Sequence, residues 1–143
     1  MLQISRASTQ YEYAACIYIR TMVTIVPQVF DFHEEIDRTE NEAVSFIGWL
    51  DKAPTATARY RILDGGTGKL ERVAIMPKYQ GMGFGKAIVS WTLKELFSDG
   101  AVSACRVCAQ THAHGFYRKF GFVAVGDPYD VQGVPHQDMI LNG

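Results

Sequence analysis

The spacing of apolar residues along the chain predicts short strands and helices in close succession. Alternating positions, short apolar runs and turn residues predict strands at residues 2–6, 43–50, 56–63, 69–76, 102–109, 122–125 and 134–141. Helical spacing predicts helices from a cap at Ser8 or Thr9 to about residue 20, over residues 84–97 and over residues 111–120. Residues 22–32 are apolar but contain Pro27, so we expect a broken or second short helix there.

This order of elements predicts a mixed α+β fold. The segments follow the order β-α-α-β-β-β-α-β-α-β-β, which indicates a largely antiparallel sheet with one βαβ unit over residues 69–109. Residues 31–42 carry six carboxylates and are expected to form a loop. No repeat, low-complexity tract or Pro/Gly-rich linker divides the chain, so residues 1–143 are predicted to form a single domain.

Composition and charge exclude several classes of protein. Of the 143 residues, 48% are hydrophobic and 20% are charged, which excludes disorder as the default. The net charge of -1 gives no basic field for nucleic acid, and no apolar run reaches the ~18–20 residues that a membrane helix needs. The first residues lack the pattern of a signal peptide, and three cysteines do not suggest a disulfide framework. We therefore expect a cytoplasmic protein with reduced thiols and no nucleic-acid or membrane partner.

The most informative segment runs from a strand through Pro77 into a glycine loop and a helix. Gly81, Gly83 and Gly85 allow a tight turn in which backbone amides point at one spot, and the helix dipole favours an anion there. Two familiar phosphate loops do not fit. A dinucleotide fingerprint needs Gly where Lys86 stands, and a P-loop needs Gly where Gln80 stands and Ser or Thr at position 87. A tight helix entry that binds nothing is the alternative.

The residues around this loop resemble the acyl-CoA signature of the GNAT N-acetyltransferases. Residues 75–85 read Ile-Met-Pro-Lys-Tyr-Gln-Gly-Met-Gly-Phe-Gly, and residues 113–122 carry the later family element with Tyr117 and a closing Gly-Phe. A narrower likeness, to the small ElaA-like bacterial branch, rests on Arg20, residues 35–37, 58–59, 71–73, 109–110 and 133–136. The resemblance covers most of the chain. It implies a mainly antiparallel central sheet, flanked by helices and splayed open between the parallel strands of residues 69–76 and 102–109.

The resemblance also implies acetyl-CoA as co-substrate, with no metal. Pantetheine would lie in the gap in the sheet, and the pyrophosphate would lie on the glycine loop. The expected cofactor-binding residues are Val73, Ala74, Ile75, Gln80, Gly81, Met82, Gly83, Phe84, Gly85, Lys86, Gln110 and Tyr117. Gln80 stands where Arg is commoner and Gln110 where Asn is common, so these two contacts depart from the family pattern. Lys86 either reaches a phosphate or is solvated.

Three residues are candidates for proton transfer. The resemblance gives Tyr117 the role of acid toward the departing thiolate; packing is its alternative role. Glu71 is expected to share a strand face with Val73 and Ile75, where a half-buried carboxylate of raised pKa could act as base. Its alternative is a structural ion pair with Arg59 or Arg72. Histidine as a residue type can exchange a proton in the useful pH range, so His136 is a second candidate base, or else a surface residue.

Neither the cysteines nor the histidines predict a metal site. Cys105 and Cys108 are three apart on a strand and face opposite sides, which prevents chelation and disulfide formation. His112 and His114 are two apart and point to different helix faces.

The function that these observations predict is direct transfer of an acetyl group from acetyl-CoA to a small amine or peptide amine in a ternary complex. A non-catalytic acyl-CoA-binding sensor is the main alternative, and a nucleotide-phosphate binder is a weaker one. The six carboxylates of residues 31–42 either favour a cationic acceptor or form a solvated loop. The sequence leaves open whether the chain is a monomer or a homodimer.

Overall fold

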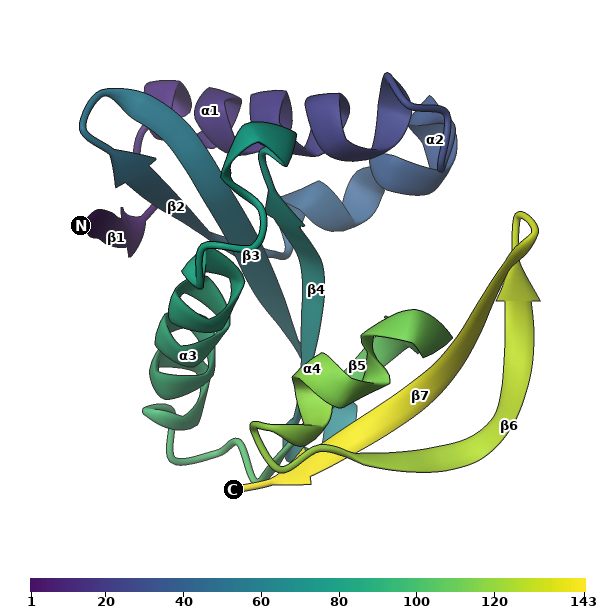
Figure 1. The fold of residues 1–143 in the computed structure, drawn as a ribbon. Coiled ribbons are helices and arrows are strands. Elements are labelled where there is room, and N and C mark those ends of the chain that lie inside the picture. Colours follow the sequence, from purple (N-terminus) through teal and green to yellow (C-terminus); the bar gives the residue numbers. More distant parts are fainter.

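A seven-stranded mixed sheet runs through the molecule, which a computed structural model describes over residues 1–143 (Figure 1). The strand order is β1-β2-β3-β4-β5-β7-β6, and β4 and β5 form the only parallel pair. The strands are β1 (Leu2–Arg6), β2 (Val44–Leu50), β3 (Ala53–Leu63), β4 (Thr67–Ile75), β5 (Ala104–Gln110), β6 (Val123–Val131) and β7 (Val134–Asn142). The predicted mixed α+β class with a mainly antiparallel sheet is confirmed.

Helices cover both faces of the sheet. They are α1 (Gln10–Arg20), α2 (Phe32–Glu35), α3 (Phe84–Phe97) and α4 (His114–Arg118). A small buried cluster that includes Ile19 and Ile47 lies between α1 and the sheet. A larger cluster on the opposite face joins the sheet to α3 and α4, with Ile88 and Tyr117 among its members. The sheet is therefore the middle of three layers.

Helix α1 begins with a capping box. The Thr9 hydroxyl accepts a bond of 3.1 Å from the Glu12 amide, and the Glu12 carboxylate accepts one of the same length from the Thr9 amide. Thr9 is thus the cap, one of the two expected. The broken helix expected over residues 22–32 is instead a π-helical turn, Thr21–Ile25, which continues α1 and ends just before Pro27.

The loop expected over residues 31–42 is in fact two short helical segments. Asp31 caps α2 by accepting a bond of 2.9 Å from the Glu34 amide. Asp37 caps a 3-10 helix, Arg38–Asn41, by accepting one of 2.8 Å from the Thr39 amide. The sequence interpretation considered only the charge of these two aspartates, but the side chain of each caps a helix.

The last hairpin is longer than expected. The strand expected to end at residue 125 continues to Val131 as β6, because residues 126–128 form an irregularity in the strand pairing and not a chain reversal. The reversal occurs at Gln132 and Gly133, which both have positive φ. The helix expected over residues 111–120 is a 3-10 turn, Thr111–Ala113, followed by α4.

A bulge in β4 changes which residues share a face. The pairing with β3 shifts between Thr57 and Arg59, and Arg72 takes the left-handed conformation with φ of 55°. Leu70, Val73 and Ile75 therefore pack on the α3 side, whereas Ala74 packs on the α1 side. The expectation that Glu71 shares a face with Val73 and Ile75 is wrong, because simple alternation ends at the bulge.

Strands β4 and β5 separate halfway along their length, as expected. Their register runs from Thr67 opposite Ala104 to Leu70 opposite Val107 and then stops. Beyond this point β5 stays paired with β7, which bends away with β6 from the rest of the sheet (Figure 1). The unpaired halves of β4 and β5 form the two sides of a split in the sheet.

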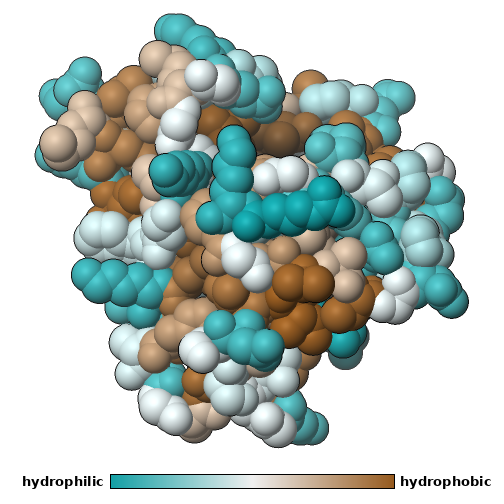
Figure 2. All heavy atoms as spheres, turned by 60° about the horizontal axis from the view of Figure 1, so that its bottom comes forward, coloured by the Kyte–Doolittle hydropathy of each residue, from teal (hydrophilic) through white to brown (hydrophobic).

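Figure 2 shows one face of the molecule, on which polar side chains cross the middle and apolar side chains gather above and below them. No helix is both long and apolar enough to cross a membrane. All three cysteines are free; Cys105 is buried and Cys108 is exposed, on opposite sides of β5 as predicted. The homodimer stays a prediction.

Candidate active site

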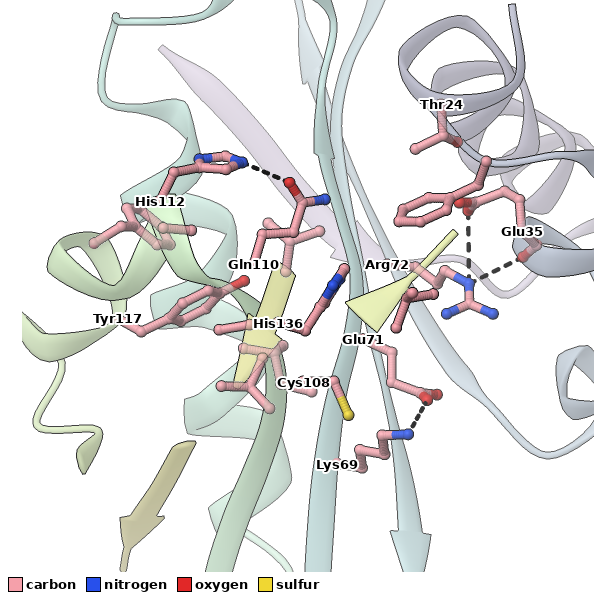
Figure 3. A pocket seen from close by; sticks show the side chains of 18 of the residues that line it. Thr24, Glu35, Lys69, Glu71, Arg72, Cys108, Gln110, His112, Tyr117 and His136 are labelled. Atoms are coloured by element: carbon pink, nitrogen blue, oxygen red, sulfur yellow. Dashed lines mark hydrogen bonds and ion pairs between the residues drawn. The ribbon is translucent and has the colours of Figure 1, made fainter. Parts of the chain in front are cut away.

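A cavity of about 510 Å³ lies where β4 and β5 part (Figure 3). Val73 and Ile75 line it from β4, and Ala109 and Gln110 line it from β5. All three candidates for proton transfer, Tyr117, Glu71 and His136, also line it. The split in the sheet thus brings together residues from β4, β5, α4 and β7.

A second cavity of about 550 Å³ lies over the glycine loop. Ile75, Gly85 and Phe116 line both cavities, so the two adjoin each other. The expected residues that line the second cavity are Ile75, Gln80, Gly81, Gly83, Phe84, Gly85 and Lys86. A long ligand could therefore reach from the glycine loop into the split.

The glycine loop presents backbone amides to this second cavity. Gly81 and Gly83 have φ of 78° and 85°, and a Cβ at either position would project into open space. Gly83 precedes α3, and no side chain caps this helix end, so the amides of its first turn are free to bind a ligand. Lys86 and Lys119 add two cations to the lining. This donor set fits a pyrophosphate.

Gln80 differs from the expected phosphate contact. Its side-chain amide donates a bond of 3.1 Å to the Ile75 carbonyl, which closes the turn between β4 and the loop. Gln80, which stands where Arg is commoner, therefore bonds to the chain itself. The cations that line this cavity are Lys86 and Lys119.

Tyr117 places a hydroxyl group in the first cavity. Its side chain is only 8% exposed, and no protein group bonds to its oxygen (Figure 3). Burial raises the pKa of Tyr117 well above its ordinary value, with a smaller effect from the nearby Cys105 thiol. The phenol therefore keeps its proton at neutral pH and can donate it within the cavity.

His136 is held in one tautomer. Its Nδ1 lies 2.8 Å from the Val134 carbonyl oxygen, which can only accept, so Nδ1 carries a proton. In the neutral ring, Nε2 is then the acceptor. The ring is 6% exposed and packs between Tyr129 and Phe30, with centroid distances of 6.0 and 6.1 Å. His136 is a buried cavity residue, not a surface one.

Gln110 and His112 form a pair at the edge of the first cavity. His112 Nε2 donates to the Gln110 side-chain oxygen over 2.5 Å (Figure 3). This bond fixes the Gln110 amide and leaves its nitrogen without a protein partner. Gln110 lies opposite His136 in the β5–β7 ladder, so both side chains are on the same face of the sheet.

Glu71 makes the ion pairs that were its alternative role. It pairs with Arg59 at 3.2 Å, Arg61 at 2.7 Å and Lys69 at 3.2 Å. Burial alone would raise the pKa of Glu71, but the bond from Arg61 and the charges of Arg59 and Lys69 outweigh it and lower the pKa to about 2. The expectation of a raised pKa is wrong, so the structure gives Glu71 no proton affinity near neutral pH.

Two of the six acidic residues of 31–42, Glu35 and Glu40, take part in a buried network. Glu35 pairs with Arg20 at 2.7 Å, and Glu40 bridges Arg20 and Arg59 at 2.8 and 2.9 Å. Tyr13 adds a bond of 2.7 Å to Glu40. The expectation of a solvated segment is therefore wrong for Glu35 and Glu40, whereas Asp31, Glu34, Asp37 and Glu42 are exposed. Part of the expected attraction for a cationic acceptor is also lost, because Glu35 and Glu40 neutralise arginines of the fold.

Replacing Glu71 with Gln should lower the free energy of unfolding by roughly 3 kcal/mol at pH 7, because it leaves buried cations unpaired. The folded pKa of Glu71 is below its unfolded value of 4.5, so its contribution is complete above pH 4.5 and is lost as pH falls toward 2. Urea unfolding at pH 7 and pH 3 measures both effects. The variant should lose less stability than wild type between these values. Glu42→Gln, at an exposed partner of Arg61, is the control and should change little.

Two expected cofactor residues do not line either cavity. The Ala74 side chain packs toward α1, and Met82 is 58% exposed. The sequence interpretation also missed residues that do line the cavities: Phe30, Arg72, Cys108, Tyr129, Phe116 and Lys119. Lys119 and Phe116 lie inside the segment that carries Tyr117, which was the available signal. Phe30 and Tyr129 lie in segments without a recognisable motif.

Known proteins match this chain along most of its length. The model of the acetyltransferase (GNAT) family matches residues 10–122. The uncharacterized N-acetyltransferase YjcF of Bacillus subtilis (strain 168) is 30% identical over 135 residues, which are 94% of this chain and 95% of YjcF. Protein ElaA of Escherichia coli (strain K12) is 26% identical over 128 residues, 87% of this chain and 84% of ElaA.

Solved structures share the same fold. The crystal structure of Escherichia coli ElaA has a TM-score of 0.85 and 25% identity and covers 98% of this chain and 97% of its own. A Bacillus subtilis acetyltransferase crystallised in complex with CoA has a TM-score of 0.75 at 12% identity, with 99% of both chains covered. The chain and these proteins thus share one fold.

Proposed function

This chain belongs to the acetyltransferase (GNAT) family, and on that premise we propose that it is an N-acetyltransferase that moves an acetyl group from acetyl-CoA to a primary amine while both substrates are bound. Proteins of this family use acyl-CoA. The assignment of the acceptor, the direct transfer and the roles of individual residues are our proposal.

The position of the two cavities side by side, with Ile75, Gly85 and Phe116 in both linings, is the observation that supports it best. The amides at the start of α3, with Lys86 and Lys119, would bind the pyrophosphate. The unpaired edge of β4 near Val73 and Ile75 would bind the pantetheine arm where the two cavities adjoin. Such a ligand would end beside Tyr117 and His136, which both line the first cavity.

Two residues carry the proton transfers in this proposal. Acetyl-CoA supplies the acetyl thioester. An alkyl ammonium has a pKa of about 10.4, so the acceptor must lose a proton before it attacks, and His136 Nε2 takes that proton. The neutral amine attacks the thioester carbonyl, and the bond from carbon to sulfur breaks. Tyr117 gives its proton to the departing thiolate and regains, through water, the second proton that the nitrogen loses as the amide forms. Glu71 stays ionised and holds β3 and β4 together.

Release of free thiol from acetyl-CoA in the presence of an amine panel tests the proposal. Wild type should release thiol with at least one amine, and CoA at about 100 times its Kd should raise Tm by roughly 5–10 °C. Gly83→Val should lose both effects, because a branched side chain is strained at φ of 85° and blocks the approach to the amides. Gly100→Val, in the open loop after α3, is the matched control and should keep both.

The same experiment separates the rival functions. A Tm shift with CoA but no thiol release with any amine would favour the non-catalytic acyl-CoA-binding module. A larger Tm shift with ATP than with CoA would favour a nucleotide-phosphate binder. A folded Gly83→Val protein with an unchanged CoA shift would contradict the assignment of the glycine loop.

A further inference from the structure

One carboxylate on the wall of the first cavity has no cationic partner. Five charged residues line this cavity: Glu34, Glu35, Lys69, Glu71 and Arg72. Lys69 pairs with Glu71, and Arg72 lies 3.6 Å from Glu35. Glu34 takes part in no ion pair and is exposed. The three carboxylates and two cations give the wall a net charge of about -1, and that charge belongs to Glu34.

Arg72 fixes the backbone that carries this carboxylate. Its Nε donates to the Glu35 carbonyl over 2.9 Å, and its NH2 group donates to the Glu34 carbonyl over 3.3 Å. Arg72 sits on the bulge of β4, so these bonds tie α2 directly to the split in the sheet (Figure 3). Glu35 is itself held by Arg20 at 2.7 Å. The backbone of Glu34 is therefore held at the cavity wall, and its exposed side chain is free to bind a substrate.

An aromatic surface lies on the same wall. Phe30, from the segment just before α2, packs against His136, which packs in turn against Tyr129. The Tyr129 hydroxyl donates to Asp138, which pairs with Arg106 at 2.8 Å. The aromatic faces are thus held in place, and they suit the apolar stem of a substrate and attract a cation near it.

A carboxylate in this cavity helps the reaction only if the positive charge that it binds is not on the reacting amine. A carboxylate that bound the reacting ammonium would stabilise its protonated form and so oppose the deprotonation that attack requires. A carboxylate that binds a second, distant cation orients the substrate without this cost. His136 Nε2, buried and without a protein partner, is the group left for the reacting amine.

We propose that the acceptor is an amine that carries a second positive charge, and that Glu34, whose backbone is held by Arg72, binds this second charge while the amine lies at His136. The proposal rests on the proposed function for the identity of the reacting end. Lys69 and Arg72 face the same cavity, but Glu71, Glu35 and Asp37 neutralise them, so they neither repel a dication strongly nor bind an anion.

Calorimetry with three four-carbon amines on the CoA-loaded protein tests this inference. 1,4-Diaminobutane, 1-aminobutane and 4-aminobutanoate differ only in the far group, which is cationic, absent or anionic. The diamine should bind about fivefold more tightly than the monoamine, the scale of a partly exposed ion pair. Glu34→Gln should remove this difference and leave the affinity for 1-aminobutane unchanged. Glu42→Gln, on the same chain segment but outside the cavity, should keep the difference.

The outcomes separate this inference from the proposed function. An unchanged diamine preference in Glu34→Gln, tightest binding of 4-aminobutanoate, or no binding of any of the three would overturn the inference. Repeating the experiment with acetyl-CoA adds thiol release as a second readout. Glu34-dependent binding of the diamine without thiol release would contradict the enzymatic proposal and leave the assignment of Glu34 standing.

Discussion

Tyr117→Phe should lower kcat by ~10²–10³-fold while leaving the affinity for CoA within about twofold of wild type. The substitution removes one hydroxyl group and keeps the ring that packs against Phe116 and Phe122. In wild type this hydroxyl is buried, protonated and without a protein partner. Without it, the thiolate must depart without this proton donor.

Steady-state kinetics and CoA calorimetry on the same preparation measure both quantities. Tyr11→Phe is the matched control, because Tyr11 is 73% exposed and stacks on Trp49, on the face covered by α1. It should keep the wild-type kcat. Full activity of Tyr117→Phe across the pH range would show that the thiolate leaves unaided or that another group protonates it.

His136→Gln should lower kcat/KM by ~10²-fold at neutral pH. Glutamine can still donate to the Val134 carbonyl and fill much of the space between Phe30 and Tyr129, but its amide cannot take up a proton. The remaining rate should then rise steadily with pH, because the reaction depends on the small fraction of amine that is already neutral.

The pH dependence of kcat/KM distinguishes the loss of a catalytic base from a packing defect around residue 136. His33→Gln is the control, since His33 packs edge-to-face against Phe32 and does not line the cavity. A parallel drop of the whole His136→Gln profile, without a change in its form, would indicate a packing defect. An unchanged profile would remove His136 from proton transfer altogether.

The sequence predicted the parts of the site that depend on local chemistry. The glycine loop has a run of three glycines after a proline, and two of these take positive φ at the start of α3. Tyr117 stands in a short motif beside it. The splayed sheet followed from the resemblance that these motifs carry, and the likeness to ElaA is confirmed by sequence and structure. Each of the two motifs, the glycine loop and the segment that contains Tyr117, lies within about a dozen consecutive residues.

The features that the sequence could not predict depend on distant contacts. Arg72 has a left-handed backbone conformation, which favours glycine. Its bonds to Glu34 and Glu35 join residues that are more than thirty positions apart in the chain. The network of Arg20, Glu40 and Arg59 likewise joins residues about 20 positions apart. Alternation with period two cannot reveal such a bulge, so the face of Glu71 was assigned wrongly.

A crystal structure of the protein with bound CoA tests the central claim most directly. The account predicts that the pyrophosphate bonds to the amides at the start of α3, that the pantetheine arm follows the unpaired edge of β4, and that the sulfur lies within hydrogen-bond distance of the Tyr117 hydroxyl. Pyrophosphate bound away from residues 83–86, or a CoA sulfur that lies outside the cavity shared by Tyr117 and His136, would contradict it.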